Sequence, residues 1–336
     1  MKTSTAAVVT CAMVVIGVVL LPAIGGPLNP PAGPPASTPG PEPQIAVNAT
    51  NTPGDPTSVF RIDLPGSYYL AGNVIGVAAR NGITITASNV TLDLMGFEVR
   101  GADGQASLDG IRVGGVGGVN IAVLNGSVSG WGGDGIDAFT GAGNVRIEGV
   151  SVSANGGDGI RVGINCMVSR CAVFGNVGDG IEAGEASIIG ACTSRSNGLG
   201  IRAGDVRSIT DCIVSHSVNN GIQASSGCRI SGNVSAYSGI GTITSSDFSI
   251  TGDYNRIEGN QSINGFRGIS AVGARNVIVR NTCSNVDTFA NRYFLFENNY
   301  YGPIIPRVGF PTPQASGDSA PSTLSTTDPY ANFSVK

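Results

Sequence analysis

The stretch NGGDGIRVG at residues 155–163 contains the step Gly159-Ile160, and the recurrence of this step decides the fold. The same Gly-Ile step recurs with its isoleucine at Ile111, Ile136, Ile160, Ile181, Ile201, Ile222 and Ile269. The first six isoleucines are 25, 24, 21, 20 and 21 residues apart, and the last interval of 47 residues spans about two periods. A period of about 20 to 25 residues is typical of a solenoid, in which each unit buries its apolar face against its neighbours.

Within one period, apolar and polar residues alternate as they do in β-strands. Ile160 and Val162 fall on one face and Arg161 on the other, and Val150 and Val152 flank Ser151 in the same way. Chain breakers separate these short runs, among them Glu148-Gly149, residues 155–158 and Gly163. Each turn is therefore predicted to hold about three short strands, which makes the domain all-β.

The Asp-Gly-Ile turn, the three-strand coil and the run NVTLDLMG at residues 89–96 resemble bacterial right-handed parallel β-helix repeat proteins of the pectate-lyase-like superfamily. The resemblance covers residues 59–303 and implies a right-handed parallel β-helix of about nine rungs with terminal caps. Residues 63–70 are expected to form the N-terminal cap, and five aromatic residues within 293–301 the C-terminal one. Because this fold hosts lyases, hydrolases, epimerases and adhesins, it implies no single reaction.

The segments outside the coil point to a protein that leaves the cytoplasm. Residues 1–26 combine Lys2, an apolar run and small residues near Ile24, as a secretory signal peptide does; an uncleaved anchor is the alternative. Residues 27–58 are expected to form a proline-rich linker, and residues 304–336 a flexible tail. The predicted location is secreted or cell-envelope, with membrane contact only through an uncleaved N-terminal segment.

Three cysteines, Cys171, Cys192 and Cys212, occupy matching inward positions on successive turns. They are expected to stack at the strand spacing of about 4.8 Å. Two interpretations stay open, a column of buried thiols and a disulfide between rungs. The spacing favours thiols, because parallel side chains hold their Cβ atoms slightly too far apart for a disulfide. His216 is the only histidine and no Cys-x-x-Cys pair occurs, so no metal site and no cofactor are expected.

The outward position after each isoleucine carries alternating charge. It holds Arg112, Asp137, Arg161, Glu182, Arg202 and Gln223. One interpretation is an ion ladder that fixes the register of the rungs, because opposite charges on neighbouring strands attract. The other is a groove that binds a polysaccharide or cell-surface glycan, because arginine pairs with sugar carboxylates in a fork. These six residues are the candidate ligand-binding set.

Asp109, Asp134, Asp158 and Asp179 form a second column, each directly before its glycine. A column of carboxylates is one way to bind calcium, but the calcium nonapeptide pattern occurs once rather than in tandem. We therefore expect turn chemistry, in which each aspartate bonds to its own backbone. Asn155, Asn176 and Asn197 are expected to form a similar ladder of stacked amides.

The signatures of polygalacturonase-like hydrolases and alginate epimerases, which the family resemblance suggests looking for, are absent from the sequence. A calcium-assisted lyase with an arginine base stays open, with Asp137, Arg161, Glu182 and Arg202 as catalytic candidates and calcium as its only cofactor.

The net charge of −4 and the absence of a basic patch argue against a nucleic-acid partner. Three function classes remain. The first is a non-catalytic extracytoplasmic β-helix that binds or presents to polysaccharide. The second is a polysaccharide lyase or related enzyme, and the third is a structural or adhesive surface protein. Short turns between the strands favour binding, since an enzyme cleft needs long loops.

Overall fold

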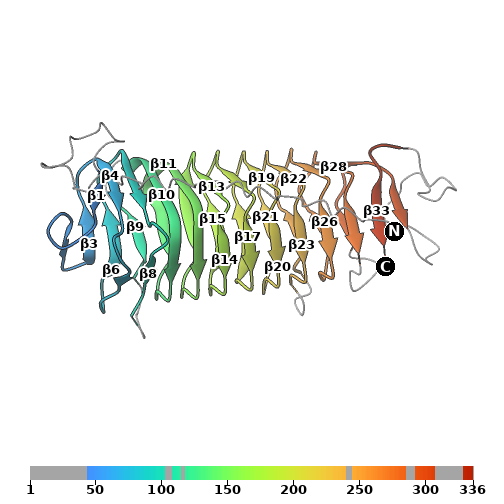
Figure 1. The fold of residues 1–336 in the computed structure, drawn as a ribbon. Coiled ribbons are helices and arrows are strands. Elements are labelled where there is room, and N and C mark those ends of the chain that lie inside the picture. Colours follow the sequence, from blue (N-terminus) through green and yellow to red (C-terminus); the bar gives the residue numbers. More distant parts are fainter. Residues whose placement is uncertain are drawn as a thin grey trace, which may run out of the picture. The chain divides into compact units, whose positions relative to one another are not determined.

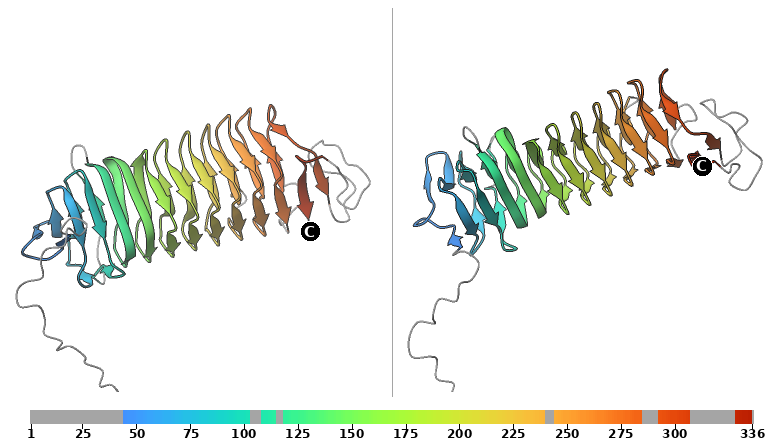
Figure 2. Two further views of the ribbon diagram at one scale, coloured as in Figure 1. Left: turned by 45° about the horizontal axis from the view of Figure 1, so that its top comes forward. Right: turned by 90° about the horizontal axis from the view of Figure 1, so that it is seen from above.

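The computed structural model describes residues 44–102, 108–114, 118–239, 244–284, 292–306 and 328–335, all within one compact unit, Glu42–Lys336. This unit is a parallel β-solenoid of about ten turns, one more than expected. Its strands stack side by side along one axis (Figures 1 and 2). Among the described residues no helix is long and apolar enough to cross a membrane. The predicted signal segment, most of the predicted linker and residues 307–327 lie outside the described residues.

Sheet I, which carries the Gly-Ile steps, is built from strands that stack one turn apart. Its strands are β3 (Ser58–Ile62), β6 (Asn81–Ile85), β9 (Ile111–Val113), the first part of β11 (Ile136–Ser153), β12 (Ile160–Ile164), β15 (Asp179–Ala183), β18 (Leu199–Ala203), β21 (Ile222–Ala224), β24 (Phe248–Ile250), β27 (Ile269–Ala271) and β30 (Tyr293–Leu295). Each pairs in parallel with the strand one turn away, and β2 (Pro53–Asp55) pairs antiparallel with β3.

Sheets II and III complete each turn. Sheet II contains β1 (Ile45–Ala46), β4 (Gly66–Tyr69), β7 (Val90–Asp93), the middle of β10 (Gly118–Ser129) and of β11, β13 (Met167–Ser169), β16 (Ile188–Gly190), β19 (Ser208–Thr210), β22 (Arg229–Ser231), β25 (Arg256–Glu258), β28 (Val277–Val279) and β31 (Tyr300–Tyr301). Sheet III contains β5 (Val74–Ile75), β8 (Glu98–Arg100), the ends of β10 and β11, β14 (Ala172–Phe174), β17 (Thr193–Arg195), β20 (Ile213–Ser215), β23 (Val234–Ala236), β26 (Gln261–Ile263), β29 (Thr282–Ser284) and β33 (Asn332–Val335), with β32 (Ile304–Pro306) beside β33.

The predicted inward column of isoleucines is confirmed. Ile111, Ile136, Ile160, Ile181, Ile201 and Ile222 are all fully buried and pair in register along sheet I. Phe248 continues the column between Ile222 and Ile269, so the interval of 47 residues does contain two turns. Burial of a large aliphatic side chain contributes roughly 1.5 to 3 kcal/mol, and the column repeats this on every turn.

Described strands also lie outside the expected coil range of 59–303. β1 precedes it and pairs with β4, while β32 and β33 follow it. The segment expected as an N-terminal cap is instead a full strand of sheet II, because Tyr68 points into the core at 3% exposure and β1 covers the outer edge. Of the C-terminal aromatics, Tyr293 is buried and its hydroxyl donates to the carbonyls of Asn281 and Phe333, at 2.7 and 3.0 Å.

Ladders of asparagine side chains stabilise the turns. The predicted ladder exists: the side-chain amide of Asn155 donates to Asn176 Oδ1 at 2.8 Å, and that of Asn176 to Asn197 Oδ1 at 2.9 Å. Two further ladders were not predicted from the sequence. One consists of Asn233, Asn260, Asn281 and Asn332, and the other of Asn255, Asn276 and Asn299. Each amide satisfies buried backbone and side-chain groups on two turns at once, which locks neighbouring turns together.

The cysteine column is present as free thiols. Cys171, Cys192 and Cys212 are buried and unpaired, as the sequence predicts, and their sulfurs donate to backbone carbonyls. We expect labelling with a thiol reagent after denaturation without reductant to modify all three, and labelling of the folded protein to modify none. Mass mapping of the labelled peptides checks this. A missing label on two of the three after denaturation would reveal a disulfide between rungs.

Candidate functional site

The outer face of sheet I carries the charge ladder, which we define as Arg112, Asp137, Arg161, Glu182, Arg202 and Gln223. The parallel register pairs each member with the next, from Arg112 with Asp137 to Arg202 with Gln223. The alternation of inward isoleucine and outward polar residue in each strand places the six side chains on one face. The structure therefore brings together all six residues of the predicted ligand-binding set.

Each ladder arginine is held by at least one carboxylate. Arg112 Nη1 lies 3.4 Å from Asp137 Oδ2 and 2.8 Å from Asp109 Oδ2. The Nε atom of Arg161 donates to Glu182 Oε2 at 2.8 Å, and Arg202 pairs with Asp179. Each arginine is thus anchored and presents the rest of its guanidinium to solvent.

The aspartate column bonds to the backbone, though not in the way expected. The Oδ1 atom of Asp109 accepts the backbone N–H of Asp134 at 2.9 Å, Asp134 accepts that of Asp158 at 2.7 Å, and Asp158 accepts that of Asp179 at 2.6 Å. Asp109, Asp134 and Asp158 therefore bind the next turn rather than their own backbone, because stacking places the donor of the neighbouring rung directly above each carboxylate. The column stabilises the stack.

Burial of this column shifts its ionisation. The pKa of Asp134 rises to about 6 and that of Asp158 to about 7, first because burial disfavours the charged form and then because neighbouring carboxylates repel. The backbone hydrogen bonds that each carboxylate accepts oppose this rise. Asp134 and Asp158 therefore keep their protons to a higher pH than an exposed aspartate does.

The arrangement gives little support to an arginine base. Burial lowers the pKa of Arg161, but its hydrogen bond to Glu182 and the nearby carboxylates outweigh this effect, and the pKa is raised. The pKa of Arg202 is raised chiefly by its bond to Asp179. A base must give up its proton near the working pH, and both shifts oppose that. Within the described ranges, no three acidic, histidine or cysteine side chains gather to hold a metal ion.

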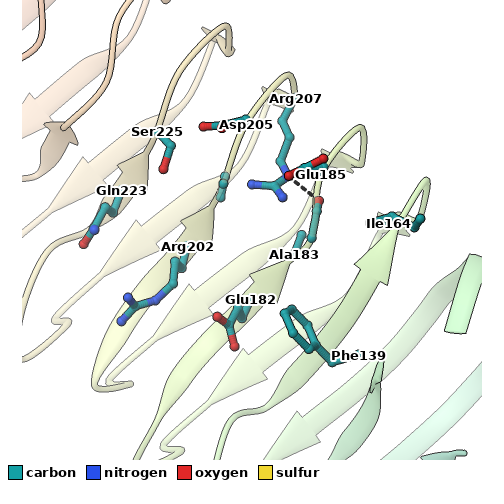
Figure 3. Close-up of a pocket in the computed structure, with 13 residues that line it drawn as sticks. Phe139, Ile164, Glu182, Ala183, Glu185, Arg202, Asp205, Arg207, Gln223 and Ser225 are labelled. Carbon is teal, nitrogen blue, oxygen red and sulfur yellow. Dashed lines mark hydrogen bonds between the residues drawn. The ribbon is translucent and has the colours of Figure 1, made fainter. Parts of the chain in front are cut away.

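A pocket of about 460 Å³ opens beside the ladder (Figure 3). Glu182, Arg202 and Gln223 contribute one wall from sheet I, and the turns to sheet II contribute another. The ring of Phe139 lines one end, and the Arg161 guanidinium lies 4.3 Å from the centre of that ring. A pocket with an aromatic wall and several hydrogen-bonding groups suits a sugar.

The turn residues that line this pocket were not predicted from the sequence. They are Glu185, Asp205, Arg207 and Ser225. A signal was available, because segments beginning at Gly163, Gly184 and Gly204 each have four residues and end on Cys166, Ser187 and Arg207. When these segments are aligned, Arg207 takes the position that the small residues Cys166 and Ser187 hold on the two preceding turns, where a long charged side chain is unexpected.

Reversing the charge of Glu182 tests the structural part played by the ladder. Glu182→Arg places three arginines in register and removes the partner of Arg161, so we expect a loss of about 1 kcal/mol in unfolding free energy. The loss should shrink in about 1 M salt because these groups are partly exposed. Chemical denaturation measures it, with Glu297→Arg on an exposed turn as control. Equal stability of the two variants at low salt would contradict a register role.

Comparison with known proteins shows which solved structures have a similar fold. No family model matches this chain, and no curated protein matches its sequence. Among solved structures, the A-module of the Azotobacter vinelandii mannuronan C-5 epimerase AlgE4 matches with a TM-score of 0.56 at 12% identity, over 76% of this chain and 87% of that one. Pectate lyase Pel9A matches with a TM-score of 0.42 at 15% identity, over 66% of each chain. The enzymatically active domain of tailspike protein 2 of bacteriophage CBA120 matches with a TM-score of 0.45 at 15% identity, over 78% of this chain and 47% of that one.

The chain is a right-handed parallel β-helix. The fold that the sequence resemblance implied is therefore confirmed.

Proposed function

We propose that this protein is an extracytoplasmic β-helix that binds acidic polysaccharide along the charge ladder and its pocket, without catalysing a reaction on it. The observation that carries the proposal is the unbroken register of ladder side chains beside a pocket of about 460 Å³. A flat parallel sheet presents these groups at a regular spacing, which matches a ligand that is itself a repeating chain. The location outside the cytoplasm rests on the apolar N-terminal sequence alone.

The fold comparison supports the kind of ligand. Mannuronan is a polysaccharide, and the matched epimerase is named for it. At 12% to 15% identity, the matched structures show a shared fold and do not show a shared activity. The binding proposal therefore depends on the residues of the ladder, and the raised pKa values of Arg161 and Arg202 favour binding over lyase chemistry.

Calorimetric titration with pectate, alginate and chondroitin sulfate tests the proposal. The double variant Arg161→Ala/Arg202→Ala removes two guanidinium groups from the ladder, and we expect it to weaken binding at least about tenfold, since hydrogen bonds to charged groups are worth roughly 1.5 to 3 kcal/mol each. The control is Arg146→Ala/Arg170→Ala, which removes the same charge from residues that pair with Glu148 on another face.

Two outcomes would overturn the proposal. If the parent binds none of the three polysaccharides at low ionic strength, or if both double variants bind equally well, the ladder serves stability alone. Appearance of unsaturated sugar products, with or without calcium, would replace the binding role with lyase activity.

A further inference from the structure

Arg207 occupies an unusual position in the turns between sheets I and II. The strand register places one inward side chain of each turn in a single column, which contains Cys166, Ser187, Arg207, Cys228, Asn255, Asn276 and Asn299. The other members are small or amide side chains, and Arg207 is the charged member. It is nevertheless only 5% exposed. A charged side chain that is buried this deeply normally has a partner of opposite charge.

Only some of the N–H groups of the Arg207 guanidinium have a hydrogen-bond partner. Its Nε atom donates to the carbonyl of Gly184, but Nη1 is buried and has no partner among the described residues. No described carboxylate lies within ion-pair distance of it, whereas the ladder residues Arg112, Arg161 and Arg202 all have one. The site is shaped for this group, because a Cβ atom at Gly204 would lie 2.5 Å from Nη1 and 2.8 Å from Nη2.

This guanidinium lines the pocket beside the charge ladder. Figure 3 shows the Arg207 side chain reaching from its turn towards the preceding one, with Glu185 beside it and Arg202 and Glu182 on the strands below. Burial lowers the pKa of Arg207, and the negative charges of Asp205, Glu185 and Glu182 oppose that shift. Arginine stays charged at neutral pH, so the pocket contains a cation that lacks a bonded anion.

We propose that Arg207 binds the carboxylate of one acidic sugar unit in this pocket, and that the carboxylates around it accept hydrogen bonds from the hydroxyls of the same unit. This inference rests on the proposed function and adds the group that selects an acidic sugar over a neutral one. Three carboxylates and two guanidinium groups line the pocket, so a dianion such as a phosphate ester is disfavoured. A planar carboxylate matches the planar guanidinium, which favours it over a tetrahedral sulfate ester.

Titration with a galacturonate oligosaccharide, its methyl ester and dextran sulfate tests the inference. We expect the parent to bind the acid at least about tenfold more tightly than the ester, and Arg207→Met to lose several-fold of this preference while binding the ester unchanged, since Arg161 and Arg202 supply the rest of it. Arg195→Met is the control and should keep the preference, because the Arg195 side chain is exposed at the end of strand β17 in sheet III. Gly204→Ala displaces the guanidinium without removing its charge and should also reduce the preference.

The outcomes separate the two proposals. A parent that binds neither oligosaccharide overturns the proposed function, whereas retention of the acid preference by Arg207→Met overturns only the role of Arg207. Tighter binding of dextran sulfate than of the acid would overturn the choice of carboxylate. Without ligand, Arg207→Met should unfold at the parent temperature or above it, since it removes an unpaired buried charge. A clear loss of stability would show that Arg207 has an internal partner.

Discussion

Asn260→Leu should lower the unfolding free energy by about 3 to 5 kcal/mol, because it removes the central amide of the Asn233–Asn332 ladder. Asn260 Oδ1 accepts both the backbone and the side-chain N–H of Asn233, each at 3.0 Å. Its amide donates to the carbonyl of Ile230 at 2.9 Å. Leucine removes these three hydrogen bonds and the one that the Asn260 amide donates to Asn281 Oδ1 at 3.0 Å, and each buried group that is left without a partner costs roughly 1 to 3 kcal/mol.

Thermal unfolding followed by circular dichroism measures this loss, which corresponds to a fall in midpoint on the order of 10 °C. Gln261→Leu is the matched control, because Gln261 is the next residue, is exposed and points outward from strand β26. It should shift the midpoint by no more than a degree or two. Similar midpoints for the two variants would show that the amide ladder contributes little to stability.

Asp247→Asn should stabilise the protein at alkaline pH. Asp247 is fully buried, takes the place of the glycine in the Gly-Ile step, and accepts hydrogen bonds from Ser262 Oγ at 2.6 Å and Ser235 Oγ at 3.1 Å. Burial raises its pKa to about 7, and these hydrogen bonds only partly oppose the shift. Above pH 7 the folded coil therefore contains a buried carboxylate.

The sign of the pH dependence follows from the raised pKa. Between the unfolded pKa near 4 and the folded pKa near 7, the folded state retains a proton that the unfolded state releases, so stability is highest at low pH and falls as the pH rises through about 7. At 1.36 kcal/mol per pKa unit, Asp247→Asn should gain on the order of 4 kcal/mol over the parent at pH 8 and nothing near pH 4.

Denaturation at pH 4, 6 and 8 checks the Asp247 prediction. Asp211→Asn serves as control, because Asp211 is exposed and asparagine tolerates its left-handed backbone conformation. The stability of Asp247→Asn should retain part of the pH dependence of the parent, because the pKa values of Asp134 and Asp158 are also raised in the folded protein. A pH-independent difference between Asp247→Asn and the parent would contradict the ionisation account.

The sequence predicted the parts of the coil that repeat strictly. The Gly-Ile steps gave the period, the inward isoleucines and the register of the charge ladder, because one alternating strand per turn fixes which residues meet. The ladder of Asn155, Asn176 and Asn197 followed from the same spacing. Each of these predictions depends on position within a period and needs no knowledge of the turns.

The turns and the ends were predicted less well for a physical reason. Tyr68 belongs to a strand and not to a cap, since nothing in its own segment shows that β1 covers it. The partner that anchors Arg202 is Asp179, which precedes the step on the neighbouring turn, rather than Glu182 in its own column. Arg207 becomes notable only when its column is known, and column membership depends on turn lengths that alternation does not fix.

A crystal structure of the protein with a bound galacturonate oligosaccharide tests the central claim most directly. We predict that the chain of sugars lies along the outer face of sheet I, in contact with Arg161 and Arg202, and that one sugar enters the pocket with its carboxylate on Arg207. A ligand bound on sheet II or sheet III, or on sheet I without contact to these arginines, would contradict the account.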